Sequence, residues 1–257
     1  PDFAQVEPDR LSTLSAGEFH APHYDEGFFK ADWMRGFGKP YELMMPECLY
    51  GWGEWTVAPL PSMKTMGAIA LASGAALNLG HVVVPSGPCG GRVAAPVEEG
   101  YARMARWLKP RRAWCESSEA IPVAAILNPV ANLRLDSCRE GRWLETPPAG
   151  VRGAHAMLLD THWPADLLVE ETARNLERYE VILAPDLLHL PEALAEALRA
   201  YVRGGGTLIV EGRTGLAEAD GTPRADFALA DLTGTHLDGV AGLKVRYLDG
   251  LAPELAR

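Results

Sequence analysis

The sequence predicts an α/β protein in two parts: the C-terminal portion of a (β/α)8 barrel over residues 1–116, and an open parallel α/β domain over residues 117–257. Two observations support this division. Short apolar runs alternate with amphipathic segments along most of the chain, as in strand–helix units. The composition also changes, from rich in Trp, Met, Gly and Pro in the first part to rich in Leu, Ala, Val and Glu in the second.

Two strand–helix units are predicted in the first part. Residues 41–45 form the first candidate strand, and Ser62 is expected to cap the helix that follows. Residues 76–84 form the second candidate strand, followed by a helix over residues 96–108. Two such units suit the end of a barrel, which needs about 200 residues or more to close. The missing strands are therefore expected upstream of Pro1, where the chain begins without a Met, as a fragment or processed product would.

The second part contains three short apolar runs, at residues 121–127, 180–184 and 207–210. Runs that are apolar on both faces are typical of strands covered by helices on each side of a parallel sheet. A helix around residues 154–160 and a strand around residues 165–169 are predicted between the first two runs. This alternation indicates right-handed strand–helix–strand units in one sheet.

A further helix is predicted between the last two runs. Pro191 fits its first turn, and Glu192 favours the positive end of the helix dipole. Gly204-Gly205-Gly206 is expected to end it, because glycine adopts the left-handed conformation without a steric penalty. The expected apolar stripe holds Leu194, Leu198, Tyr201 and Val202.

Charge and cysteine spacing exclude several classes of function. The chain has a net charge of −10 and no Lys/Arg cluster, whereas a nucleic-acid binder or a protein of an anionic membrane surface needs a basic face. No segment approaches the roughly 20 apolar residues of a membrane span. The four cysteines lack the short spacing of a zinc site. We therefore predict a cytoplasmic protein with reduced thiols, no metal and no cofactor.

Four segments of the first part, residues 17–23, 39–47, 50–53 and 74–80, carry a family resemblance. They resemble the last third of the barrel of family 29 α-L-fucosidases. In that family a Trp/Tyr-Glu pair precedes a Trp-Gly turn, and a helix then leads to a Gly-x-x-Leu-Leu-Asn-x-Gly-Pro strand. The sequence departs from this pattern in ending the strand with Asn78-Leu-Gly-His81.

Residues 119–235 resemble the trimerisation domain of family 42 β-galactosidases. The family's Tyr-x-Val-Ile-x-x-Pro strand and Tyr-Val-x-x-Gly-Gly-x-Leu segment correspond to residues 179–185 and 201–208. The resemblance implies a flavodoxin-like fold, similar to that of class I glutamine amidotransferases, and a homo-oligomer. Those amidotransferases place a nucleophilic Cys at a tight turn where this chain has Pro185. An amidotransferase-like hydrolase is thus the least favoured alternative.

The fucosidase resemblance assigns Glu42 as a catalytic carboxylate. Glycoside hydrolysis usually needs two carboxyl groups, located in a barrel at the carboxyl ends of strands. The family's nucleophile is an Asp on an earlier strand that no position here matches, so half of the catalytic pair is expected to be absent. His81 is expected to be a hydrogen-bonded wall residue. Substrate-binding candidates are Trp52, Glu47, Trp55, His20, Glu18 and Asn78.

Together these features predict a portion of a glycoside hydrolase acting on a carbohydrate, with a non-catalytic α/β domain for structure and oligomerisation. The expected partners are a carbohydrate substrate and either further copies of the chain or a companion chain that completes the barrel. The main alternative is a structural or oligomerisation module without activity. In that case the acids are surface or salt-bridged groups, and the Trp side chains fill the barrel mouth.

Overall fold

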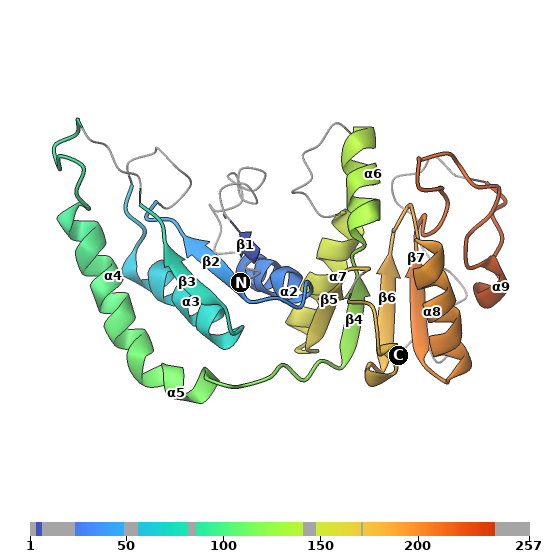
Figure 1. The fold of residues 1–257 in the computed structure, drawn as a ribbon, viewed down its shortest axis with the longest axis horizontal. Helices are drawn as coiled ribbons and strands as arrows, with labels where there is room; N and C mark the ends of the chain where they lie inside the picture. Colours follow the sequence, from blue (N-terminus) through green and yellow to red (C-terminus); the bar gives the residue numbers. More distant parts are fainter. Residues whose placement is uncertain are drawn as a thin grey trace.

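The computed structural model describes residues 4–6, 24–48, 56–81, 86–140, 148–170 and 172–239. These residues form two parallel β-sheets with helices packed on them (Figure 1). In this part of the chain no helix is both long and apolar enough to cross a membrane, and no group of three His, Cys, Asp or Glu side chains could hold a metal ion. The predicted α/β class with parallel strands is confirmed.

The first sheet has the strand order β1-β2-β3, with both neighbouring pairs parallel. Strand β2 (Tyr41–Met45) matches the prediction, whereas β3 (Ala76–Leu79) is shorter than expected. Residues 82–84 of the predicted strand lie outside the described residues. The other elements of this region are β1 (Ala4–Val6), α2 (Tyr24–Arg35), α3 (Leu60–Ala72), α4 (Ala95–Leu108), η1 (Lys109–Arg111) and α5 (Arg112–Cys115).

The expected cap of α3 is wrong. Helix α3 begins at Leu60, with Pro59 in the extended N-cap position and no side-chain cap hydrogen bond. Ser62 therefore lies inside the first turn. Pro61 is tolerated beside it because the first N–H groups of a helix have no intrahelical acceptor. One face of the helix is apolar and buried, and it includes Met63, Ile69 and Ala70.

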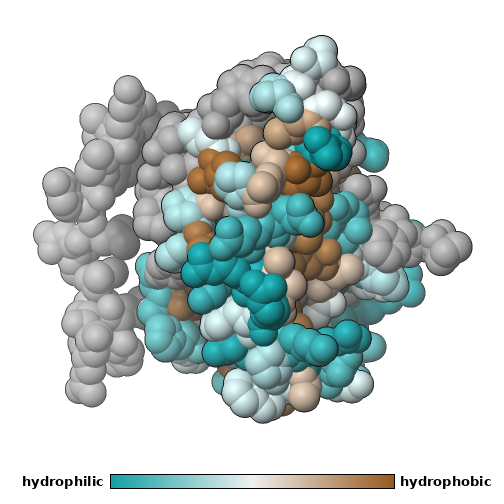
Figure 2. Space-filling view, turned by 90° about the vertical axis from the view of Figure 1, so that its left-hand side faces the viewer, coloured by the Kyte–Doolittle hydropathy of each residue, from teal (hydrophilic) through white to brown (hydrophobic). Residues whose placement is uncertain are grey.

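Side chains along β2 alternate between two faces of the first sheet, as in any strand. Tyr41, Leu43 and Met45 are buried in clusters with residues of α2, α3 and α4. Glu42 and Met44 lie on the opposite face and are only partly buried. The outer face of the molecule at α4 shows hydrophilic residues mixed with smaller hydrophobic patches (Figure 2), as a helix on the outside of a sheet should.

The second sheet has the strand order β5-β4-β6-β7, and all neighbours run parallel. In chain order this is 2-1-3-4, the arrangement of flavodoxin-like doubly wound sheets. Helix α6 and the short helix α9 were not predicted from the sequence. The elements are β4 (Ala124–Leu127), α6 (Val130–Glu140), α7 (Ala149–Asp160), β5 (Ala165–Leu168), η2 (Leu176–Arg178), β6 (Val181–Pro185), α8 (Glu192–Arg203), β7 (Thr207–Glu211) and α9 (Ala230–Thr233).

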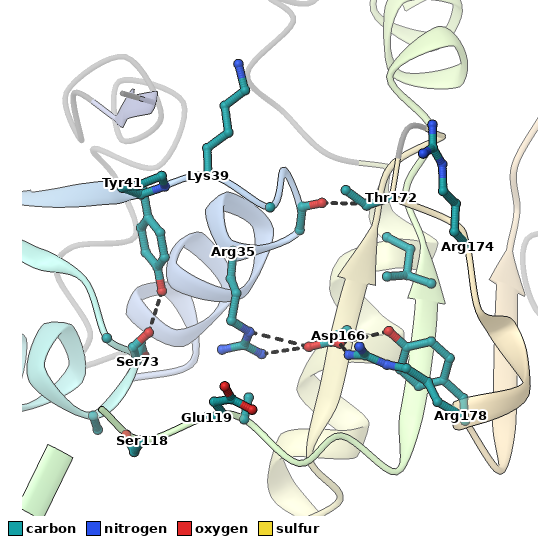
Figure 3. A pocket seen from close by; sticks show the side chains of 18 residues that line it. Arg35, Lys39, Tyr41, Ser73, Ser118, Glu119, Asp166, Thr172, Arg174 and Arg178 are labelled. Atoms are coloured by element: carbon teal, nitrogen blue, oxygen red, sulfur yellow. Dashed lines mark hydrogen bonds and ion pairs between the residues drawn. The ribbon is translucent and has the colours of Figure 1, made fainter. Parts of the chain in front are cut away.

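Helix α2, also unpredicted, joins the two sheets. At its C-terminal end Arg35 Nη2 lies 3.1 Å from Asp166 Oδ1 on β5, and Arg178 Nη2 donates to Asp166 Oδ2 at 2.5 Å. Figure 3 shows the two guanidinium groups on either side of this carboxylate. The hydroxyl of Thr172 donates to the carbonyl of Gly36 at 2.5 Å. These residues line a polar cavity of about 550 Å³ between the amino-terminal ends of β2 and β5.

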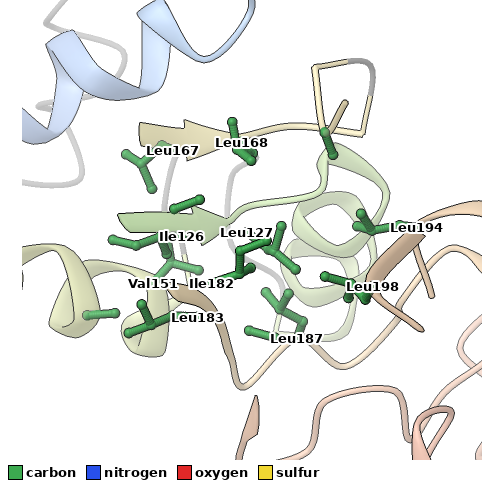
Figure 4. Packing of buried hydrophobic residues seen from close by; sticks show 14 of the residues in the cluster. Ile126, Leu127, Val151, Leu167, Leu168, Ile182, Leu183, Leu187, Leu194 and Leu198 are labelled. Atoms are coloured by element: carbon green, nitrogen blue, oxygen red, sulfur yellow. The ribbon is translucent and has the colours of Figure 1, made fainter. Parts of the chain in front are cut away.

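The core of the second sheet is built from β4, β6 and the helices that cover them. Ile126, Leu127 and Ile182 are completely buried; Figure 4 shows Leu127 and Ile182 on the side of Leu198 of α8, and Ile126 on the side of Val151 of α7. Phe29 and Trp33 of α2 belong to the same buried cluster. Both faces of β4 are covered, as the apolar run predicted. The first part of the chain thus supplies side chains to the core of the second.

The prediction of coverage on both faces is wrong for β7. This strand lies at the edge of the sheet, and its residues alternate between exposed and half-buried. Ile209 is 50% exposed, because no helix covers its side among the described residues. The preceding helix α8 ends at the predicted glycines, where Gly205 has a left-handed φ of 98°, but it begins at Glu192, so Pro191 is its N-cap and not part of its first turn as predicted. Sequence pattern alone did not separate an edge strand from a central one.

Candidate active site at the carboxyl edge of the first sheet

Glu42 lies in the interior of β2 and is paired with a residue of β3. The register sets Glu42 beside Ala76 and Met44 beside Asn78. Side chains two residues apart on neighbouring strands share a face and are within reach of long side chains. Asn78 accordingly donates from Nδ2 to Oε1 of Glu42 at 2.8 Å. The candidate carboxylate is therefore held within the sheet, three residues before the end of its strand.

A second carboxylate lies beyond the carboxyl end of the same strand. Glu47 follows the end of β2 at Met45, and His81 follows the end of β3 at Leu79. Because the strands are parallel, both residues are brought to the same edge of the sheet. His81 Nδ1 and Glu47 Oε2 are hydrogen-bonded to each other. Both side chains are largely buried, with 15% and 12% of their surfaces exposed.

The backbone around this pair is fixed from several sides. The amide of Ala58 donates to the carbonyl of Glu47 at 2.7 Å, and the amide of Gly80 donates to that of Met45 at 2.9 Å. Tyr101 of α4 donates its hydroxyl to the Gly80 carbonyl at 2.7 Å. Burial raises the pKa of Tyr101, and the negative charges of Glu47 and Cys48 raise it further. Tyr101 is therefore a neutral hydrogen-bond donor near the acid–histidine pair.

The structure brings three of the predicted site residues to one face or edge of the sheet. Glu42 and Asn78 form one pair, and Glu47 forms the second with His81, which is hydrogen-bonded as expected. Tyr101 was not among the predicted site residues. Its hydroxyl contact with Gly80 depends on tertiary packing and has no local sequence signal. Four other candidates lie outside the described residues: Glu18, His20, Trp52 and Trp55.

The fold and this edge define an α/β protein of two parallel sheets, the first of which presents an acid–histidine pair beyond its strands. Residues 146–256 match the sequence family described as the β-galactosidase trimerisation domain. This match confirms the resemblance predicted for the second part of the chain. No protein with a curated description matches the sequence.

Solved structures share the fold over most of the chain. A β-galactosidase from the haloarchaeon Halorubrum lacusprofundi is 19% identical with a TM-score of 0.65, over 84% of this chain and 34% of that protein. A catalytic mutant of Gan42B, a GH42 β-galactosidase from G. stearothermophilus, is 19% identical with a TM-score of 0.61, over 78% and 31%. An α-L-fucosidase isoenzyme from Paenibacillus thiaminolyticus is 20% identical with a TM-score of 0.58, over 72% and 27%. The chain thus spans about a third of the length of these proteins.

Proposed function

We propose that this chain is part of a glycoside hydrolase. In this proposal residues 1–116 are the C-terminal portion of a (β/α) barrel that forms one wall of a carbohydrate site, and residues 117–257 form a non-catalytic oligomerisation domain. The observation that carries the proposal is the Glu47–His81 pair at the carboxyl edge of the first sheet. Barrel enzymes carry their catalytic groups at this edge. The match of residues 146–256 to a β-galactosidase domain supports the same reading.

Geometry favours Glu47 over Glu42 as the reacting carboxylate. A strand rises about 3.3 Å per residue, so Glu42 lies roughly 10 Å below the end of β2 at Met45. A substrate at the mouth would reach Glu47 first. Glu42 is also engaged by Asn78, within the sheet. We therefore propose Glu47 as one catalytic carboxylate and Glu42 with Asn78 as the polar floor of the site.

The proposed activity is tested with aryl glycosides. The protein, purified under native conditions with any polypeptide that stays bound to it, is expected to hydrolyse an aryl β-galactoside or an aryl α-L-fucoside, the substrates named by its structural relatives. The readout is release of the aryl alcohol at neutral pH. A preparation that hydrolyses neither compound and binds neither sugar at millimolar concentration would contradict a carbohydrate site and favour the structural module.

Assembly is tested by the mass of the native protein. Because residues 146–256 match a trimerisation domain, we expect a homo-oligomer, with three copies of the 27.8 kDa chain as the first expectation. Native mass spectrometry measures this directly. A mass that is not a multiple of the chain mass would indicate a companion chain that completes the barrel. A monomer at micromolar concentration would contradict an oligomerisation role for the second domain.

The arrangement at the end of β6 does not favour an amidotransferase-like hydrolase. Asp186 follows Pro185 there with a left-handed φ of 53°. Its carboxylate accepts hydrogen bonds from the backbone amide of Arg213 at 2.7 Å and from that residue's guanidinium at 2.7 and 3.0 Å. A thiol hydrolase needs a Cys in this type of turn, in contact with a base. A carboxylate already neutralised by an arginine does not supply that chemistry.

A further inference from the structure

Gly80, which follows β3 and precedes His81, is hydrogen-bonded to both β2 and α4. Gly80 is buried, donates its amide to the Met45 carbonyl at 2.9 Å, and accepts the hydroxyl of Tyr101 at 2.7 Å. His81 is the next residue, so both its Cα position and its approach to Glu47 are fixed by bonds to β2 and α4. Groups held by packing and by further hydrogen bonds are what a precise reaction site requires.

We infer that His81 is a positioning residue for Glu47. Its Nδ1 is hydrogen-bonded to the carboxylate oxygen Oε2, and this bond fixes the orientation in which the Glu47 carboxyl group meets substrate. This inference rests on the proposed function and assigns a role within that site. In that function the carboxyl group of Glu47 attacks the sugar or takes a proton from water, depending on whether the enzyme retains or inverts configuration.

The neighbouring polar side chains have other partners: Tyr101 donates its hydroxyl to backbone carbonyls, and Glu42 accepts its hydrogen bond from Asn78.

The test compares two substitutions that differ only in keeping a donor. His81→Asn retains an amide nitrogen close to the position of Nδ1, whereas His81→Leu removes the donor and keeps a similar volume. A misplaced reacting group lowers the reaction rate about a hundredfold. His81→Leu should therefore lower kcat by about that factor, with KM little changed. His81→Asn should recover most of that loss. His236→Leu is the matched control, because it breaks an exposed His–carboxylate pair with Asp226 in the second domain.

A direct measurement separates this inference from the proposed function. In the full chain labelled with ¹⁵N-histidine, the Nδ1 resonance of His81 should report a bound proton, and it should shift in Glu47→Gln. An unprotonated Nδ1, or one unaffected by Glu47→Gln, would overturn the inference whatever the activity. Full kcat in His81→Leu would overturn the positioning role alone. Absence of hydrolysis in the unchanged protein would instead overturn the proposed function on which that role rests.

Discussion

Replacing Gly36 with alanine should lower the free energy of unfolding by about 3 kcal/mol, at the upper end of the range for overpacked sites. A Cβ added at Gly36 would lie 2.0 Å from the backbone carbonyl oxygen of Leu167 and 3.0 Å from that of Trp33. Neither obstacle is a flexible side chain that could rotate away. The backbone of α2 would have to move off β5. Urea unfolding monitored by tryptophan fluorescence measures the change.

The expected loss is large because of what α2 contributes to the second sheet. Phe29 and Trp33 pack into its core, and His155 of α7 bonds to Asp32 at 2.9 Å. Moving the helix would disturb all of these contacts together. The matched control is Gly153→Ala in α7, where an added Cβ meets nothing within 4 Å. That variant should gain up to about 1 kcal/mol from helix propensity. Equal stability of Gly36→Ala and the unchanged protein would contradict the tight approach of α2 to β5.

The contact between α2 and β5 affects how the chain can be divided into domains. The sequence predicted a boundary near residue 117, where composition changes, yet α2 lies before it and packs on β5 after it. Composition records the environment of each segment averaged over many residues. It does not record that two side chains of one helix are buried under the neighbouring sheet. The division into independent domains at residue 117 therefore remains a prediction. Helix α2 lies before that residue but packs on a strand that lies after it.

The elements predicted best from the sequence are those whose signals are local. For β6, α8 and β7 the strand runs, the apolar stripe and the glycines at the helix end lie within about thirty consecutive residues. Helix α2 was missed because its buried residues face two sheets: Phe29 and Trp33 pack on the second, while Ala31 packs on the first. Helices that bury residues on more than one side show no single apolar stripe.

Helix α6 was missed for a different reason. It follows Asn128-Pro129, which reads as a turn, and its N-terminal amides are satisfied from a distant part of the chain. Glu170 accepts hydrogen bonds from the amides of Val130 at 2.6 Å and Ala131 at 2.7 Å. A carboxylate at this position stabilises the positive end of the helix dipole. Since it comes from 40 residues away, a search for local capping residues does not find it.

The residues of the candidate site could be predicted from the sequence, but which of them are hydrogen-bonded to each other could not. Glu42, Glu47 and Asn78 were identified from a resemblance and from their places near strand ends. Which residue meets which depends on the register of β2 against β3, since that register sets Glu42 within reach of Asn78. A shift of one residue would turn the side chains of a strand to the other face. Strand register of parallel neighbours is fixed by tertiary packing, so the pairs appear only in the structure.

The most severe loss of activity is expected for Glu47→Gln. Under the proposed function, this change removes the reacting carboxyl group while leaving an amide that can still hydrogen-bond to His81, so the fold should persist. Loss of a reacting carboxylate typically costs about 10²–10⁴-fold, and we expect kcat/KM for an aryl glycoside to fall by about 10³-fold. Initial rates and the thermal unfolding midpoint are measured on the same preparation, so that a folding defect is recognised.

Glu42→Gln is the comparison that decides between the two carboxylates. The amide oxygen of Gln can still accept the bond from Asn78 Nδ2, so only charge is lost at this position. If Glu42 belongs to the floor of the site, Glu42→Gln weakens about one hydrogen bond to the substrate. The reaction rate should then fall roughly tenfold. A larger loss in Glu42→Gln than in Glu47→Gln would restore Glu42 as the catalytic group assigned by the fucosidase resemblance. It would also mean that chemistry occurs deeper in the sheet than the carboxyl edge where barrel enzymes usually react.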